Sequence, residues 1–413
     1  MYISVKTADR LERAFAILGL SFFVGSFTGL IGVVPPGIYP SPALNTLLRY
    51  VVWFGALLLL VPRWQKTLRV MAQDIFLWII TILAILSFLW SDFRDFVYLN
   101  SREVMQMTAF GLYFAVRFTL KDQVKLLAWT MALGITLSIL VCLAFPSIGI
   151  HQGVHSGAWR GVYIDKNYFG SLMVMSLVVF FVLPIEQARD RLCSWLGMAM
   201  SALMLILATS RTSLTLSIFL ILILSFYRNF RWRGKQTVLW MDLGILIVGS
   251  ISTVLFSNWV EIVVGMGRDP TLSGRTHIWS IALYRFWERP LLGFGRGAFW
   301  APGSRFAAEA SPDPSLTYIP PHGHNGFVDL LLDIGLIGFS CFLISFGVAY
   351  IRSLSRAYET KRSENLWPLG FLTFLVMNNM TESLLLYLNT IYWVLYVAIV
   401  LSVGQKDDEY QES

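Results

Sequence analysis

The chain has 413 residues, of which 56% are hydrophobic and only 14% are charged. Soluble domains carry about a quarter charged residues, so this composition excludes an ordinary soluble protein and indicates an integral membrane protein. The length would suit two or three soluble domains, but apolar runs recur from one end of the chain to the other. We therefore expect a single all-α polytopic membrane domain that spans residues 1–413.

Twelve apolar stretches are candidate transmembrane helices, because open strands cannot cross a bilayer. They are residues 14–34, 45–62, 74–90, 99–116, 126–145, 168–184, 194–209, 212–227, 238–256, 325–349, 367–384 and 386–403. The weakest candidate is 99–116, since Arg102 and Glu103 lie at its start. One long polar loop, residues 257–325, separates the ninth and tenth stretches, and such loops usually carry function.

The placement of Lys and Arg predicts the orientation of these spans. With the N-terminus in the cytoplasm, 20 of the 32 Lys and Arg residues fall on the cytoplasmic side. Both termini are then cytoplasmic, and the 257–325 loop faces outward. The net charge of +7 follows mainly from this topology, so it gives no reason to expect nucleic-acid binding. The N-terminus lacks the pattern of a removable signal peptide.

Several cations fall on the outer side in this topology. Arg160, Lys166 and Asn167 precede the sixth span, Arg211 lies in a tight turn between the seventh and eighth, and Arg102 lies near the outer end of the fourth. Cations at membrane depth are costly and usually functional. Their number under one loop indicates a site for an anion, and diphosphate fits the forked geometry of Arg.

Each of these cations also has a simpler interpretation. Arg211 could be a charge that reaches the membrane edge, and Arg160 and Lys166 could be ordinary loop charges. Arg102 could pair with Glu103 or cap a helix.

The polar residues of the eleventh span are open to two interpretations as well. Glu382 could bind substrate at the outer face. It could instead join Asn378 and Asn379 in hydrogen bonds between helices.

The 257–325 loop contains a predicted helix from about Gly274 to Arg289. Ser273 is a plausible N-cap, and Pro290 ends the helix because proline cannot continue its hydrogen bonds. The helix is rich in apolar side chains, so it should lie along the membrane surface or against the bundle. Arg275 falls in its first turn, where free backbone N–H groups already favour an anion. A solvated charge at a helix start is the simpler alternative.

His324 directly precedes the point at which the chain re-enters the membrane. A neutral imidazole at this boundary can take a proton from a hydroxyl group near pH 7. It could instead cap the helix that follows. His322 is two residues away, but no acidic or cysteine cluster accompanies the pair, so we expect no metal and no cofactor. The cysteines should be small buried hydrophobic residues; they are Cys142, Cys193 and Cys341.

The order and outward placement of these motifs resemble the O-antigen ligase and Wzy-type polymerase superfamily. The similarity covers roughly residues 155–400, and no single motif is specific on its own. The runs that carry it are Arg160-Gly161 with Asp165-Lys166-Asn167, Ser210-Arg211-Thr212, Ser273-Gly274-Arg275-Thr276-His277-Ile278-Trp279, Arg289-Pro290-Leu291-Leu292-Gly293, His324-Asn325-Gly326 and Asp333-Ile334-Gly335-Leu336-Ile337-Gly338. The Lys166-Asn167 pair and the run from Asn378 to Glu382 look most like the exopolysaccharide-polymerase branch.

The resemblance implies a metal-independent glycosyltransferase of the bacterial inner membrane. Its donor would be a polyprenyl-diphosphate-linked oligosaccharide, and its acceptor a glycan or a lipid-linked sugar. By the same resemblance, Arg211 and Arg275 hold the diphosphate and His324 activates the acceptor hydroxyl. Arg160, Lys166, Asn167, Arg102, His322 and Glu382 are the further candidates for substrate binding.

Three other functions remain open at this point. A ligase would pass the glycan to a lipid-linked core sugar, and a protein glycosyltransferase would pass it to Ser or Thr. A glycolipid transporter would use the same cations only for binding. The chain lacks paired halves with matching broken helices, which argues against a transporter.

Overall fold

The computed structural model describes residues 5–27, 42–152, 155–229, 275–312, 315, 319–359, 362–386 and 390–405. Within these residues the chain is helical, and the sole pairing of extended backbone is a single bridge between Ile150 and Trp159. The α-helices are α1 (Val5–Val24), α3 (Pro42–Leu60), α4 (Trp64–Met71), α5 (Ile75–Leu86), α6 (Arg94–Arg117), α7 (Leu120–Ala144), α8 (Pro146–Gly149), α9 (Lys166–Phe181), α10 (Ala188–Leu207), α11 (Arg211–Asn229), α14 (Arg275–Phe286), α15 (Arg305–Glu309), α16 (Gly326–Glu359), α17 (Trp367–Asn379) and α18 (Ile391–Val403). Short 3-10 helices are η1 (Val61–Arg63), η2 (Ser87–Leu89) and η4 (Ser363–Leu366).

Five helices among the described residues are long and apolar enough to cross a membrane. They are Thr46–Met71, Leu120–Ala144, Ala188–Leu207, Arg211–Asn229 and Gly326–Tyr358. Three shorter apolar helices accompany them: Ile75–Leu89, Lys166–Phe181 and Ile391–Val403. The protein is therefore a helical membrane protein. Every predicted span except 238–256, which lies outside the described residues, overlaps a helix, and the total of twelve spans stays a prediction.

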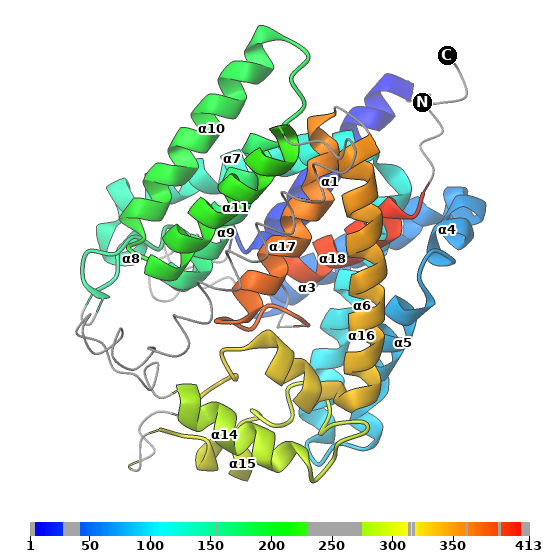
Figure 1. Ribbon diagram of the computed structural model, residues 1–413, viewed down its shortest axis with the longest axis vertical. Helices are drawn as coiled ribbons and strands as arrows, with labels where there is room; N and C mark the ends of the chain where they lie inside the picture. Colours follow the sequence, from blue (N-terminus) through cyan, green and yellow to red (C-terminus); the bar gives the residue numbers. More distant parts are fainter. Residues whose placement is uncertain are drawn as a thin grey trace, which may run out of the picture.

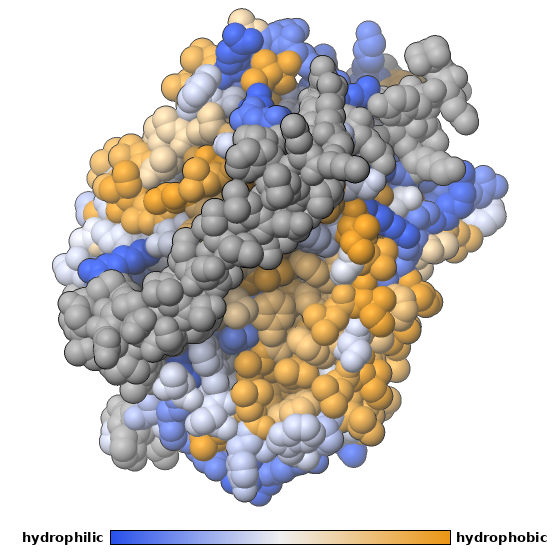
Figure 2. Space-filling model, in the orientation of Figure 1, coloured by the Kyte–Doolittle hydropathy of each residue, from blue (hydrophilic) through white to orange (hydrophobic). Residues whose placement is uncertain are grey.

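The helices are bundled, and the segment that contains α14 and α15 covers one end of the bundle (Figure 1). The beginning of α1 and the end of α18 lie toward the opposite end (Figure 1). Hydrophilic residues gather near both ends of the molecule, and apolar residues form broad areas between them (Figure 2). This distribution is the one expected for a bundle whose middle faces lipid.

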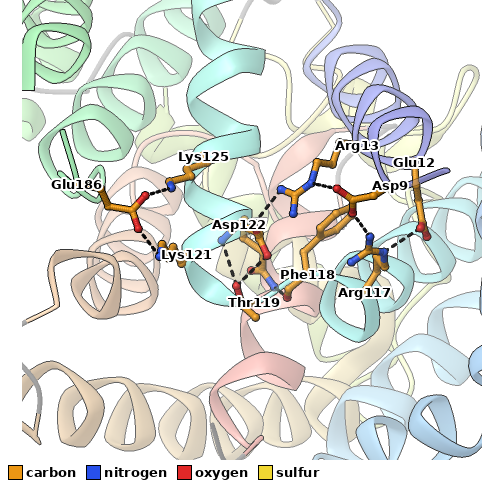
Figure 3. Close-up of polar contacts among 11 residues, drawn as sticks. Asp9, Glu12, Arg13, Arg117, Phe118, Thr119, Lys121, Asp122, Lys125 and Glu186 are labelled. Carbon is orange, nitrogen blue, oxygen red and sulfur yellow. Dashed lines mark hydrogen bonds and ion pairs between the residues drawn. The ribbon is translucent and has the colours of Figure 1, made fainter. Parts of the chain in front are cut away.

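The end of the bundle away from α14 is held together by ion pairs, several of which appear in Figure 3. Arg13 of α1 binds Asp122 of α7 at 2.9 Å. Arg117, the last residue of α6, binds Glu12 of α1 at 2.8 Å, and Arg63 of η1 reaches the same carboxylate at 3.0 Å. We call this end of the bundle, where Arg13, Arg63 and Arg117 lie, the basic end.

A second contact at the basic end joins α7 to the segment before α10. Lys121 and Lys125 both bind the carboxylate of Glu186, and their hydrogen bonds lower its pKa to about 2 (Figure 3). The loops that the charge distribution places on one side of the membrane therefore contact one another through these ion pairs. Their assignment to the cytoplasm stays a prediction.

The segment at the other end has a hydrophobic core of its own, which rests on the starts of α6 and α16. Its buried aromatic rings include Phe294, Phe299 and Phe306, which contact one another with centroids 5.0 to 5.4 Å apart. The core also includes Val97 of α6 and Leu332 of α16. The part of the 257–325 loop that the structure describes is therefore a folded cap on the bundle. We call it the outer cap (residues 275–312 and 319–325), after the side of the membrane predicted for it.

Helix α16 is interrupted at Gly335, whose φ of 65° and ψ of −170° are not helical. A Cβ atom here would lie 2.2 Å from the carbonyl oxygen of Leu291, so the position requires glycine. The interruption leaves backbone groups of α16 without helical hydrogen-bond partners, and the outer cap supplies partners for them. The bonds run from Leu336 N to Pro290 O (2.8 Å), from Ile337 N to Leu291 O (3.2 Å), from Phe294 N to Leu332 O (2.7 Å) and from Gly295 N to Asp333 O (3.1 Å).

Two expectations about local structure need correction. Helix α14 ends at Phe286 rather than Arg289, because the N–H groups of Glu288 and Arg289 bond to carbonyls three residues back and close the turn before Pro290. Its predicted cap, Ser273, lies outside the described residues. Cys193 is exposed rather than buried, because α10 buries only one face; Cys142 is buried and Cys341 is half-buried.

Candidate active site

Two of the predicted catalytic residues lie at opposite oxygens of one carboxylate. Nη2 of Arg275 is 3.6 Å from Oε1 of Glu382, and Nδ1 of His324 is 3.7 Å from Oε2 of the same side chain. Arg275 also donates from Nη1 to the carbonyl oxygen of Thr381 at 2.8 Å. The site thus brings together the start of α14, the residues before α16 and the segment after α17.

The backbone at His324 is held from both sides. Its φ of 50° lies in the left-handed region, which a non-glycine residue adopts only when its surroundings compensate. The preceding residue, Gly323, accepts a bond from Nε1 of Trp279 at 2.7 Å and donates to the carboxylate of Asp329 at 3.0 Å. The direction of the His324 side chain is therefore set by its neighbours in the outer cap and α16.

The interpretation of His324 as a helix cap is wrong. The cap is Asn325, whose Oδ1 accepts from the backbone N–H groups of Phe327 at 3.0 Å and Val328 at 3.2 Å. Because Asn325 satisfies these first donors of α16, the imidazole of His324 is not engaged in capping.

His322 supports His324 directly. The backbone N–H of His324 donates to Nδ1 of His322 at 3.1 Å, and the two rings lie 4.2 Å apart between centroids. Burial, assisted by the nearby His324, lowers the pKa of His322 to about 4. His322 is therefore neutral at pH 7, and since its Nδ1 is an acceptor, its proton lies on Nε2.

The segment that carries Glu382 is shaped by two asparagines. Oδ1 of Asn379 accepts from the N–H groups of Leu384 at 2.9 Å and Leu385 at 3.2 Å. Asn378 donates from Nδ2 to Ser171 of α9 at 3.0 Å, so the interpretation of a contact between helices is confirmed for this residue. Glu382 itself lies at the site instead.

Close approach to α16 completes the placement of Glu382. Its carbonyl oxygen accepts from the backbone N–H of Gly326 at 3.2 Å. A Cβ atom on Gly326 would lie 1.8 Å from Oδ1 of Asn379, so only glycine allows this contact.

A small cavity of about 60 Å³ lies beside His322 and is lined among others by Arg296, Asp329 and Asp333. Arg296 is only 2% exposed, and burial lowers its pKa from the usual value. Its guanidinium donates to the carbonyl oxygens of Asn100 (2.7 Å) and Leu386 (2.7 and 3.1 Å). Arg296 thus ties the segment after Glu382 to α6.

Arg211, the third predicted catalytic residue, begins α11 and is exposed. No contact between Arg211 and the His324–Glu382 pair is found in the described part of the chain. The connection is indirect: Gly170 of α9 packs against Ser210 and Ser213 beside Arg211, while the next residue, Ser171, bonds to Asn378. Arg211 therefore lies at the same end of the bundle as Glu382.

The candidates before α9 are largely engaged with their own loop. Arg160 donates to the carbonyl oxygens of Ile148 at 2.7 Å and Ile164 at 3.3 Å. Lys166 and Asn167 form the first turn of α9, where Asp165 caps the N–H of Asn167 at 2.7 Å. These contacts occupy the guanidinium of Arg160 and a backbone donor at the start of α9.

Arg102 lies apart from the other candidates. Its guanidinium is exposed and donates to the hydroxyl of Tyr50 at 3.3 Å. The alternative in which Arg102 pairs with Glu103 is wrong, since Glu103 binds Arg49 at 2.5 Å and faces the buried Arg296 at 3.8 Å. Consecutive residues of a helix point in different directions, which explains why Arg102 and Glu103 find different partners.

Backbone strain concentrates near the candidate residues. In the described residues, positive φ values outside glycine occur at Thr209, His324 and Leu386, each with φ of 50°. Thr209 lies two residues before Arg211, and Leu386 lies in the segment that carries Glu382. Such conformations cluster at functional sites, where the surrounding structure holds them in place.

Sequence reasoning missed Asp329 and Arg296. Asp329 is an acid in the apolar run that begins α16, and ionisable residues in such runs are candidates by default, so it could have been found. Nothing in the sequence separates Arg296 from other cations of the 257–325 loop such as Arg285 and Arg305. Among the described residues, no group of three or more His, Cys, Asp and Glu side chains could hold a metal ion.

Two comparisons with known proteins show what this chain is similar to. The family model described as O-antigen ligase matches residues 196–343, which include α11, the outer cap and the first half of α16. The chain is also 24% identical over 383 residues to the "Exopolysaccharide production protein ExoQ" of Rhizobium meliloti (strain 1021), covering 89% of this chain and 82% of that protein. The resemblance predicted from the motifs is thus confirmed: this membrane protein carries an O-antigen ligase match over residues 196–343 and is similar over most of its length to an exopolysaccharide production protein.

Proposed function

We propose that the protein is a glycosyltransferase that polymerises a polyprenyl-diphosphate-linked glycan at the outer face of a bacterial inner membrane, with both of its termini in the cytoplasm. The observation that carries the proposal is the meeting of Arg275 and His324 at the two oxygens of Glu382. This arrangement puts a proton acceptor next to a cation in a segment rich in backbone strain. The similarity to an exopolysaccharide production protein supports the substrate class.

In the proposed reaction, His324 acts as the general base. With a proton on Nδ1 directed toward Glu382, Nε2 would be the nitrogen that accepts the proton of the acceptor hydroxyl. The distance of 3.7 Å to Glu382 exceeds a hydrogen bond, and a movement of about 1 Å would close it, as often occurs when substrate binds. Glu382 then fixes the tautomer and stabilises the imidazolium that forms.

The bond changes balance without a metal or cofactor. The acceptor oxygen forms a bond to the sugar carbon that carries the diphosphate, and the bond from that carbon to the diphosphate oxygen breaks with inversion. The hydroxyl proton moves to His324 and then to solvent or to the released lipid diphosphate. Arg211 and Arg275 stabilise the charge that grows on the leaving group, so their binding energy acts on the rate.

The remaining predicted residues are proposed to bind substrate farther from this centre. Arg160, Lys166 and Asn167 line the end of the bundle at the start of α9, where they would contact the glycan or the lipid headgroup. His322 holds His324 in place. Arg102, which is exposed on α6, is the most peripheral of the proposed substrate contacts.

A ligase is the second candidate, because the matched family model is described as O-antigen ligase. It would use the same donor and the same base, and differ only in the acceptor. A glycolipid transporter would need the arginines but no base, so the reaction product separates this class from the two enzymes.

The test uses the full-length protein in liposomes, supplied with polyprenyl-diphosphate-linked oligosaccharide extracted from the native cells. Mass spectrometry identifies what receives the glycan: a second lipid-linked repeat for a polymerase, a lipid core sugar for a ligase. His324→Ala should lower transfer by about 10²–10⁴-fold and leave donor binding intact. His277→Ala is the matched control, since His277 is exposed on α14. EDTA should have no effect.

Two results would refute the proposal. Normal transfer by His324→Ala would remove the catalytic base. Movement of the lipid-linked oligosaccharide across the liposome membrane without any new glycosidic bond would identify a transporter.

A further inference from the structure

The carboxylate of Asp329 joins the two segments that carry the proposed base and its carboxylate partner. Asp329 lies in the first turn of α16 and is 7% exposed. Its Oδ1 accepts from the backbone N–H of Gly323 at 3.0 Å, and Oδ2 accepts from the hydroxyl of Ser383. Gly323 immediately precedes His324, and Ser383 immediately follows Glu382.

A third bond anchors this carboxylate to the outer cap. Nε1 of Trp300 donates to Oδ1 of Asp329 at 2.8 Å. The carboxylate thus accepts from three different segments, and both of its oxygens are engaged within the protein. These contacts indicate that Asp329 holds its neighbours in place.

The contact to Gly323 is unusually close. A Cβ atom at this position would lie 2.7 Å from Oδ1 of Asp329, so any larger residue would push the two apart. The carbonyl of the same residue accepts from Trp279. Both sides of the peptide that leads into His324 are therefore held, which compensates for the left-handed backbone of His324.

We infer that Asp329 is a positioning residue that sets the separation between His324 and Glu382, a role that rests on the proposed function of this pair. One carboxylate bonded to the neighbours of both residues keeps them in register through their adjoining residues. Loss of this bridge weakens the connection between the two segments. A misplacement of about 1 Å at a reacting group lowers the rate by up to about 10²-fold.

The test compares Asp329→Asn and Ser383→Ala with the unaltered full-length protein in the liposome assay, using the oligosaccharide extracted from native cells. We expect kcat to fall roughly 10- to 100-fold with KM for the donor unchanged, because the donor contacts of Arg211 and Arg275 are kept. Each change should add little to the loss caused by Glu382→Gln, because all three disturb the same pair.

Ser345→Ala is the matched control. Ser345 is a buried serine on the far part of α16, and its hydroxyl accepts from Tyr396 at 3.0 Å. The control should lose a similar amount of thermal stability and keep its kcat. If Asp329→Asn does not fold, Ser383→Ala decides the question, since it removes only one hydroxyl.

The inference fails if folded Ser383→Ala and Asp329→Asn proteins keep normal kcat, or if their losses multiply with that of Glu382→Gln. His324→Ala, measured in parallel, separates this failure from failure of the proposed function. An inactive His324→Ala with normal Asp329 and Ser383 variants would overturn the positioning role alone. An active His324→Ala would overturn the proposed function itself.

Discussion

The guanidinium of Arg296 donates two hydrogen bonds, at 3.1 and 2.7 Å, to the carbonyl oxygen of Leu386, a residue with a left-handed backbone. This contact holds the end of the segment that carries Glu382. A fully buried cation is expensive to keep, and the protein keeps it here with backbone carbonyls and the nearby carboxylate of Glu103. Arg296 therefore holds the segment that carries Glu382 in place beside the site.

Replacing Arg296 by Lys should destabilise the protein, since an ammonium group cannot reach both Asn100 and Leu386 in the directions that the guanidinium does. Loss of charged hydrogen bonds in a buried place costs about 1.5–3 kcal/mol each. The expected result is a lower melting temperature in detergent together with reduced transfer. Arg305→Lys is the control, because the Arg305 side chain is 80% exposed. Equal melting temperatures for the two variants would contradict a stabilising role for Arg296.

Conversion of Arg275 to Lys should remove most glycan transfer while preserving charge. Arg275 uses one arm for the carbonyl of Thr381 and turns the other toward Glu382, and a single ammonium cannot replace both and bind diphosphate as well. The expected loss in kcat/KM is about 10- to 100-fold, the equivalent of one charged contact. Arg285→Lys, on the same helix but bound to Glu288 and Glu309, is the matched control and should transfer normally.

Arg211→Lys should behave like Arg275→Lys, because the proposal gives both arginines the same diphosphate. The measurement is again kcat/KM with the lipid-linked donor. Near-normal transfer by Arg211→Lys beside a defective Arg275→Lys would show that Arg211 is only a charge at the membrane edge.

The proposed orientation predicts which ends of the bundle a membrane-impermeant thiol reagent can reach. In a background without the three native cysteines, Arg305→Cys of the outer cap should be labelled in intact spheroplasts. Ala188→Cys, exposed at the start of α10 beside the basic end, should react only after the membrane is opened. Labelling of Ala188→Cys alone in intact spheroplasts would reverse the orientation and place the candidate site in the cytoplasm.

The lowered pKa of His322 predicts a dependence of stability on pH. Its pKa is about 4 in the folded protein and about 6.5 when unfolded, so between these values the unfolded chain binds more protons. Stability should therefore fall as pH falls from 6.5 to 4, by up to about 3 kcal/mol from this group. Melting temperatures of His322→Asn should decline less over this range, because Asn keeps an acceptor for the N–H of His324 and cannot titrate. Parallel curves for the two proteins would show that His322 does not contribute.

The helical membrane architecture and the tight turn before Arg211 could be predicted from the sequence, because apolar length and turn residues are local signals. The pairing of Arg275 with Glu382 could not, since the two are more than a hundred residues apart and no local pattern links them. The residue that caps α16 is Asn325, one position after His324, and a difference of one residue is within the usual uncertainty of helix ends. The role proposed for Asp329 depends on three partners from separate segments, which only the folded chain brings together.

The interruption of α16 at Gly335 bears on how the protein could be divided or redesigned. Four backbone hydrogen bonds cross from residues 290–295 into the gap, so the outer cap completes a membrane helix. Cutting the cap away would leave those peptide groups unpaired, at several kcal/mol each if they face lipid. The outer cap, which carries several of the proposed catalytic residues, is therefore not a transplantable module. An exchange of this region between related proteins would have to transfer the cap and the interrupted helix α16 together.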